Sequence, residues 1–253
     1  MTAGWLPLLV AGLLLTVSAV QAGGSGAGDP EPGAMRVLVF SKTAGYRHDS
    51  IPDGIACIAA LGRDHAFAVE ATENGAAFNN DNLARFRVVV FLNTTHDVLN
   101  DDQQAAMERY IHAGGGYVGV HAAADTEYDW PWYQKLVGAW FSRHPQIQQA
   151  DVEVLDRDHP ATRHLPARWT RTDEWYDYRT QPDETVHVLM RLDTATYEGH
   201  EMGEVHPIAW CHEFEGGRAF YTGGGHTKES YAEPDFVQHL LGGIMWAAGR
   251  EGD

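Results

Sequence analysis

The sequence predicts an α/β fold with a doubly wound, mostly parallel sheet. Short runs that are apolar throughout, such as 88–92, are typical of strands buried on both faces. These runs alternate along the chain with segments of helical periodicity, which is the order that strand–helix–strand units produce. Polar loops that contain His or Asp follow several of the runs directly. In open α/β sheets such loops form the ligand site.

The first part of the chain has the composition of an export signal. Residues 1–22 carry no charged side chain, include the apolar run 8–15, and end in the small-residue sequence Val20-Gln21-Ala22. We therefore expect a signal peptide and a periplasmic or secreted protein. An uncleaved anchor is the alternative, although the run is short for a membrane span. Gly, Ser and Pro predict a flexible linker at 23–34, which leaves one domain at 35–250.

Composition narrows the partners of this domain. The formal net charge of −17 argues against nucleic acid and anionic membrane, and we expect no stable membrane insertion after signal cleavage. The 14 His residues favour metal or proton chemistry. Cys57 and Cys211 are expected to be buried thiols, although pairing between them stays open. An oligomer also stays open.

The first half of the chain alternates strands and helices. We expect strands at 36–40, 66–72 and 88–92, helices at 51–61 and 101–113, and a short helix or turn at 78–83. The loop after the first strand carries Tyr46 and His48, and Asp49 or Ser50 is placed to cap the helix that follows. No Gly-x-Gly-x-x-Gly follows that strand, so we expect no nucleotide cofactor.

Residues 114–125 are typical of a buried strand that ends in a sharp turn at His121. The turn is similar in pattern to a nucleophile elbow, with His at the reactive position. Imidazole there favours a metal ligand or an acid/base group over an acyl nucleophile. A buried structural His, hydrogen-bonded to a loop, is the alternative.

The second half predicts more strands and a closing helix. We expect strands at 151–155, 186–190 and 206–214, a hairpin turn at 215–217, an antiparallel return at 218–222, and a helix at 234–248. Three glycines precede His226 at the end of the returning strand, and glycine lets backbone approach a ligand closely. His226 is therefore the second candidate site residue after His121.

Three acidic side chains lie among three aromatic ones at 173–178. Aromatic bulk desolvates a carboxylate and raises its pKa, which suits general acid or base work. Glu174 is the first candidate and Asp173 the second. Pairing with Arg171 or Arg179 is the structural alternative for these acids. A further aromatic stretch, 128–141, is expected to line a pocket or to pack beneath it.

Five ordered blocks carry a family resemblance. These are 43–50, 119–125, 173–176, 206–210 and 223–226. Together they resemble the ThuA-like, or trehalose-utilisation, family over residues 35–249. The resemblance implies a flavodoxin-like three-layer sandwich similar to class I glutamine amidotransferases, with a mostly parallel sheet and an antiparallel C-terminal hairpin. Amidotransferases carry Cys at the elbow, whereas this chain has His121, so thiol-based glutamine hydrolysis is not expected.

The resemblance implies a protein of sugar catabolism whose partner is a sugar or keto sugar. The leading hypothesis is a metal-assisted hydrolase, lyase or isomerase that acts on 3-keto-glycosides. It gives His48, His121 and His226 the role of metal ligands or electrophilic groups. Glu174 or Asp173 would be the base or a further ligand, and this donor set fits zinc or manganese. The expected substrate contacts are Tyr46, Asp125, Trp130, Trp175 and Tyr176.

Two other functions stay open. The aromatic stretch 128–141 also suits a non-catalytic carbohydrate-binding protein, because aromatic rings stack on sugar faces. An amidotransferase-like enzyme with a different nucleophile is the third hypothesis. Its thiol version is weak, because Cys57 falls within a predicted helix and Cys211 within a predicted strand.

Overall fold

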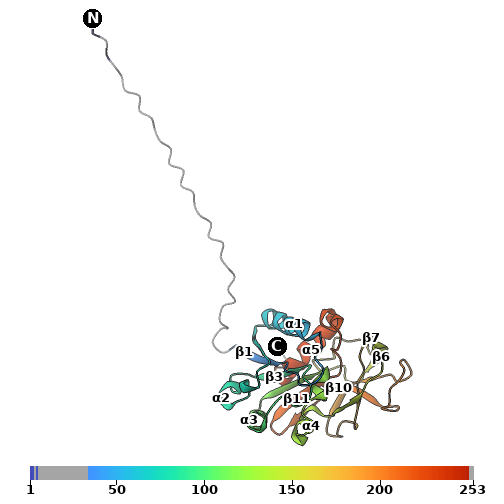
Figure 1. Cartoon of the computed structure of the whole chain (residues 1–253). Helices are drawn as coiled ribbons and strands as arrows, with labels where there is room; N and C mark the ends of the chain where they lie inside the picture. Colours follow the sequence, from blue (N-terminus) through green and yellow to red (C-terminus); the bar gives the residue numbers. More distant parts are fainter. Residues whose placement is uncertain (3, 5–33, 251–253) are drawn as a thin grey trace. The chain divides into compact units, whose positions relative to one another are not determined.

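A computed structural model describes residues 1–2, 4 and 34–250, and the account below concerns 34–250 (Figure 1). The predicted signal peptide and linker lie almost wholly outside the described residues, so those predictions stay untested. Within the described part of the chain, no helix is both long and apolar enough to cross a membrane.

The domain is organised around a nine-stranded sheet with the order β2-β1-β3-β4-β11-β10-β9-β6-β7. Its strands are β1 (Met35–Phe40), β2 (Phe67–Thr72), β3 (Val88–Leu92), β4 (Gly116–Val120), β6 (Gln148–Val154), β7 (Arg168–Asp173), β9 (His187–Leu192), β10 (His206–Phe214) and β11 (Gly217–Thr222). The first five strands in the spatial order are parallel, which confirms the predicted parallel core. Every residue of β3 and β4 is buried, as wholly apolar central strands require.

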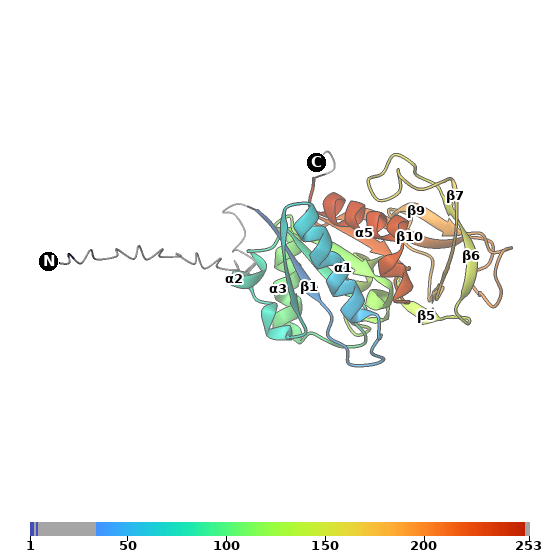
Figure 2. The ribbon, with the colours of Figure 1, turned by 90° about the horizontal axis from the view of Figure 1, so that it is seen from above.

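Helices cover both faces of this sheet, which gives the predicted three layers (Figure 1). The helices are α1 (Ile51–Asp64), α2 (Asn80–Leu83), α3 (Asp101–His112), α4 (Pro131–Val137) and α5 (Pro234–Ala247). One core lies under α1 and α5, where Ile58 and Ile244 are fully buried. The other lies under α3 and α4, where Met107 and Leu136 are buried. Figure 2 shows α1 and α5 side by side on the same face.

The antiparallel part is larger than the predicted hairpin of β10 and β11, because β9, β6 and β7 extend it by antiparallel pairing. Strand β7 was not predicted. Its inward side chains include Arg171 and Asp173, which form an ion pair at 3.1 Å, so the usual apolar alternation is absent from its sequence.

Two short elements that were not predicted begin within the aromatic stretch 128–141. Helix α4 begins with a proline and ends at Gly138, whose φ of +95° favours glycine. Strand β5 (Phe141–Arg143) pairs with β8 (Asp177–Tyr178) in a separate two-stranded ribbon. This ribbon lies beside the end of the main sheet where the candidate residues gather.

Strand direction places those candidates at one edge. Strands β1, β4 and β11 run parallel, so their carboxyl ends lie together. Four successive antiparallel pairings separate β11 from β7, and this even number returns β7 to the same direction. The loops after β1, β4, β7 and β11 therefore open at the same edge of the sheet.

Candidate metal centre

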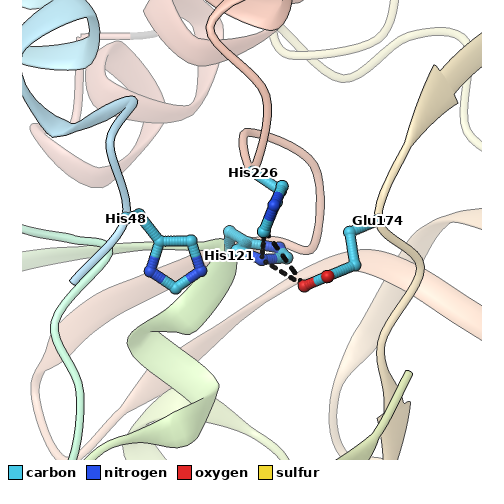
Figure 3. A group of neighbouring side chains, drawn as sticks. All are labelled: His48, His121, Glu174 and His226. Atoms are coloured by element: carbon cyan, nitrogen blue, oxygen red, sulfur yellow. Dashed lines mark hydrogen bonds and ion pairs between the residues drawn. The ribbon is translucent and has the colours of Figure 1, made fainter. Parts of the chain in front are cut away.

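Four side chains from distant parts of the chain meet at this edge (Figure 3). They are His48, His121, Glu174 and His226. One donor atom of each lies within 4.8 Å of the donor atoms of the others. Three of the residues are buried and His226 is half-buried. Imidazole nitrogens and a carboxylate oxygen gathered in this way form a typical transition-metal donor set.

The backbone at the end of β4 turns His121 into the cluster. His121 has a φ of +47° and begins the 3₁₀ helix η2 (His121–Asp125), so the strand stops abruptly. Its Nδ1 lies 2.9 Å from the carbonyl oxygen of Gly223, which only accepts. Nδ1 therefore carries the hydrogen, and Nε2 presents its lone pair to the cluster.

Three donor atoms form a nearly equilateral triangle. The Nε2 of His121 is 3.3 Å from the Oε2 of Glu174 and 3.1 Å from the Nδ1 of His226. The same Oε2 and Nδ1 are 3.0 Å apart. A tetrahedral ion with ligand bonds of about 2.0–2.1 Å separates its ligand atoms by about 3.3 Å. The triangle therefore fits such an ion.

His48 completes the donor set from the loop after β1. Its side chain is 3% exposed, and its ring centre lies 5.1 Å from that of His121 and 4.9 Å from that of His226. Burial, followed by the neighbouring imidazoles, lowers the pKa of His48 to about 2, so its ring is neutral. The buried Nδ1 has no hydrogen-bond partner among the described residues. The neutral ring offers a fourth donor nitrogen to the set.

The charges within the cluster support one another. Burial by itself raises the pKa of Glu174, but its contacts with His121 and His226 outweigh it and hold that pKa far below its usual range. Burial by itself lowers the pKa of His226, but the hydrogen bond and charge of Glu174 outweigh it and raise that pKa. Glu174 is therefore a carboxylate at neutral pH, as a metal ligand must be.

Comparison with known protein families identifies the family of this chain. The family described as "ThuA: Trehalose utilisation" matches residues 36–247. The chain belongs to the ThuA family. This finding confirms the resemblance in the sequence and gives the protein a sugar-catabolism context. A comparison with curated proteins finds no match.

Solved structures support the same conclusion. A ThuA-like protein from Bacteroides uniformis is 25% identical, with 84% of this chain and 91% of that chain covered and a TM-score of 0.72. Another, from Parabacteroides merdae, is 18% identical, with 87% and 92% covered and a TM-score of 0.72. A β-galactosidase from Bacillus circulans sp. alkalophilus is 13% identical, with 86% and 32% covered and a TM-score of 0.58, which shows the fold alone.

Asp173 of this ThuA-family protein forms hydrogen bonds with the loop that carries His226. Asp173 is fully buried, and its carboxylate accepts the backbone N–H of Gly225 at 2.8 Å and that of His226 at 3.1 Å. It also pairs with Arg171 at 3.1 Å and accepts the hydroxyl of Ser230 at 2.9 Å. Its oxygens are thus occupied, and we infer that Asp173 positions His226.

The predicted substrate contacts divide into two groups. Tyr46 lies edge-on to His48 and is 65% exposed, and the ring of Tyr176 lies 4.0 Å from that of His121. The half-buried Asp125 ends the turn that begins at His121 and accepts the hydroxyl of Tyr128 at 2.5 Å.

The two tryptophans pack away from the cluster. Trp130 is buried, stacks on Trp132, and donates to Glu108 at 3.0 Å. Trp175 is 1% exposed and donates its indole N–H to the carbonyl of Gln148 at 2.9 Å. The structure therefore brings Tyr46 and Tyr176 against histidines of the cluster, and places Asp125 at the end of the turn that His121 begins, but it does not bring these two rings there.

Sequence reasoning missed His144. Its Nδ1 lies 3.0 Å from Oε1 of Glu174, whereas the candidate metal cluster contacts Oε2. His144 follows β5, a three-residue strand whose sequence carries no strand signal. Only the pairing of β5 with β8 brings it beside Glu174.

The two cysteines lie outside the cluster. Neither forms a disulfide, as expected, and both are buried. Burial raises the pKa of Cys57, within α1, to about 11, which makes a poor nucleophile. Cys211 lies on β10 with its Sγ 3.6 Å from the Nε2 of His159. The side chain at the elbow is therefore the imidazole of His121, as the sequence indicated.

Proposed function

We propose that this ThuA-family protein is a metal-dependent enzyme that acts on a 3-keto-glycoside. The observation that carries the proposal is the triangle of His121, Glu174 and His226, with the imidazole of His48 as the fourth donor. Three imidazoles around one carboxylate suit zinc or manganese.

The proposed chemistry begins at C2 of the keto sugar. The ketone at C3 acidifies the C2 proton, which a base removes. The electron pair forms a C1=C2 double bond, the bond from C1 to the glycosidic oxygen breaks, and that oxygen takes up a proton. An ion held by the cluster would supply a Lewis acid for the ketone oxygen as its negative charge develops. Addition of water across the double bond would complete a hydrolysis.

Three carboxylates are candidates for the base that removes the C2 proton. Glu174 faces two histidines and keeps a low pKa, which suits a ligand better than a base. Asp173 is occupied by the loop of His226. Burial raises the pKa of Asp125, which lies one turn beyond His121 in η2. We therefore give proton removal at C2 to Asp125, because a raised pKa strengthens a carboxylate as a base.

A non-catalytic sugar-binding protein is the second candidate. Its original support, the aromatic stretch 128–141, is weakened because Trp130, Tyr133 and Trp140 pack into the core. Tyr46 still favours it, since an aromatic ring that is 65% exposed beside the cluster can stack on a sugar face. Stoichiometric binding without turnover, unaffected by a chelator, would favour this alternative.

The uncharged leader at 1–22 supports a periplasmic or secreted location for the enzyme. Sequencing the amino terminus of the protein recovered from the periplasm or medium tests this proposal. Cleavage after Ala22 is the expected result. Retention of the whole leader on a membrane-bound protein would contradict it.

The central test is metal content together with turnover. We expect purified protein incubated with zinc or manganese to hold about one ion per chain by elemental mass spectrometry. His121→Ala and His226→Ala should lose the ion, because each removes one corner of the triangle. His187→Ala is a matched control, since that side chain is 58% exposed and bonds Asp156 elsewhere.

Turnover should follow the metal. We expect the metal-loaded wild type and His187→Ala to cleave 3-keto-glycosides, with release of the keto sugar as the measured signal. His121→Ala should be inactive, and Asp125→Asn should hold metal but lose about 100-fold or more in rate. Full turnover by His121→Ala, or by wild type stripped of metal, would contradict the proposed function.

A further inference from the structure

The two oxygens of Glu174 face different partners. Oε2 contacts His121 and His226 within the metal cluster. Oε1 lies 3.0 Å from the Nδ1 of His144, whose side chain is 42% exposed. His144 is not among the four clustered donors, so its contact with the site passes through the carboxylate.

The direction of this hydrogen bond follows from its surroundings. The Nδ1 of His144 also lies 2.9 Å from the carbonyl oxygen of Pro145. Both neighbouring oxygens are acceptors, because Glu174 is ionised and a carbonyl cannot donate. Nδ1 therefore carries a hydrogen, shared between the two oxygens, whichever charge the ring has.

The backbone and ring of His144 are held in place. Arg143, the residue before it, pairs with Asp177 across the β5–β8 ribbon and donates to the carbonyl of Gly199 at 3.3 Å. The imidazole is stacked near Tyr176, with ring centres 5.9 Å apart and planes at 25°. Tyr176 in turn lies against His121. His144 is thus packed against the same ring that supports the cluster.

We propose that His144 is a positioning residue that orients the Glu174 carboxylate for the metal. By holding Oε1, its N–H keeps Oε2 turned towards His121 and His226. Carboxylates that bind metals are themselves hydrogen-bonded, and loss of such a partner typically costs 10–100-fold in metal affinity. This inference rests on the proposed function, because it concerns the same metal site.

The test is the dissociation constant for zinc and for manganese, measured by competition with a chelator. His144→Ala should bind each ion about 10–100-fold more weakly than wild type. His144→Asn should stay within about threefold of wild type, since the amide nitrogen of Asn takes the place of Nδ1. His144→Gln should resemble His144→Ala, because its amide nitrogen takes the place of Nε2 instead.

Two controls separate positioning from general damage. His187→Ala removes another exposed imidazole and should bind both ions as wild type does. The visible spectrum of cobalt-loaded protein reports the geometry of the ligands, so His144→Ala should shift it and His144→Asn should restore it. If His144→Ala only loosened the fold, Asn and Gln at position 144 should have the same effect on metal binding. Recovery with Asn but not with Gln therefore indicates a specific role for the hydrogen bond from Nδ1.

The possible outcomes are distinct. If wild type binds no ion, the proposed function fails and this inference fails with it. If wild type binds and His144→Ala binds equally well, only the positioning role is overturned. If His144→Ala loses binding as completely as His121→Ala, His144 is a ligand and the positioning role is again overturned.

Discussion

Asp173 and Glu174 are adjacent carboxylates with opposite surroundings. From the sequence, both are candidates for a base or a ligand, because they are adjacent and directly precede the aromatic residues Trp175 and Tyr176. Strand β7 ends at Asp173, whose side chain is buried and forms an ion pair with Arg171. Glu174 lies beyond the strand and turns towards the histidines. The different roles of Asp173 and Glu174 depend on where strand β7 ends, and the sequence did not predict this strand.

We predict that Asp173→Asn strongly destabilises the protein. Arg171 is buried and would keep only Glu233 as an ionised partner, and breaking a buried pair typically costs about 3 kcal/mol or more. Urea unfolding measures the loss. Asp49→Asn serves as the control, because that side chain is 80% exposed, and it should change stability by less than about 0.5 kcal/mol. An Asp173→Asn variant as stable as wild type would contradict the role given to Asp173.

Histidines differ in how far the sequence predicts their roles. His121 and His226 follow strands of clear apolar pattern, so their place at the sheet edge was predictable. His48 follows β1 in the same way. The expected side-chain cap by Asp49 or Ser50 is wrong: Ser50 bonds Gly225 at 3.5 Å and Asp49 pairs with Lys228 at 3.0 Å. Both contacts tie the loops of His48 and His226 together.

Helix α5 buries a histidine in the hydrophobic core. His239 is fully buried, donates from Nδ1 to the carbonyl of Ala161 at 2.7 Å, and packs near Phe236. Burial lowers its pKa to about 3, with His164, Arg171 and His159 adding to the effect. The ring is therefore neutral in the folded protein at any pH where the fold is expected to persist.

This neutral histidine should make stability depend on pH. The unfolded chain binds a proton on His239 below about pH 6.5, whereas the folded chain does not until about pH 3, so unfolding takes up a proton between these values. The contribution is present in full above pH 6.5 and is lost as pH falls, by about 2 kcal/mol between pH 7 and pH 5. His239→Leu should remove that part of the loss.

The measurement is the free energy of unfolding in urea at both pH values. The difference between pH 7 and pH 5 should be about 2 kcal/mol smaller in His239→Leu than in wild type. Phe236→Leu is the control at a neighbouring core position, and it should lose stability equally at both pH values. An unchanged pH dependence in His239→Leu would show that the folded protein binds a proton there.

Elements of the sheet were predictable where one physical pattern governs them. The parallel strands are apolar throughout because helices bury both faces, as β3 shows. Strand β7 broke that pattern because its inward positions hold the Arg171–Asp173 pair. The β5–β8 ribbon was hidden because β8 spans only two residues. Such elements are defined by their partners, so local sequence does not reveal them.

At the scale of the whole molecule, metal should link the two halves of the fold. The four candidate ligands follow β1, β4 and β11 in the parallel half and β7 at the antiparallel end. Zinc or manganese at 100 times its dissociation constant should add about 2.7 kcal/mol of stability. For a domain of this size that corresponds to a rise of about 5–10 °C in Tm.

Thermal unfolding with and without a chelator tests this prediction. Wild type should show the rise with either metal and lose it on chelation. His121→Ala should unfold at the same temperature in both conditions, because it lacks one corner of the triangle. A rise of equal size in His121→Ala would place the metal elsewhere on the protein.

The sequence by itself determined the parallel core, the family and three histidines of the site. These follow from local patterns, namely apolar strands, glycine turns and the side chains directly after them. Only the tertiary structure decided that Glu174 rather than Asp173 joins the cluster and that His144 holds its other oxygen. It also decided that Trp130 and Trp175 pack in the core. The physical reason is that orientation at a strand end depends on pairing with distant strands, which no local pattern records.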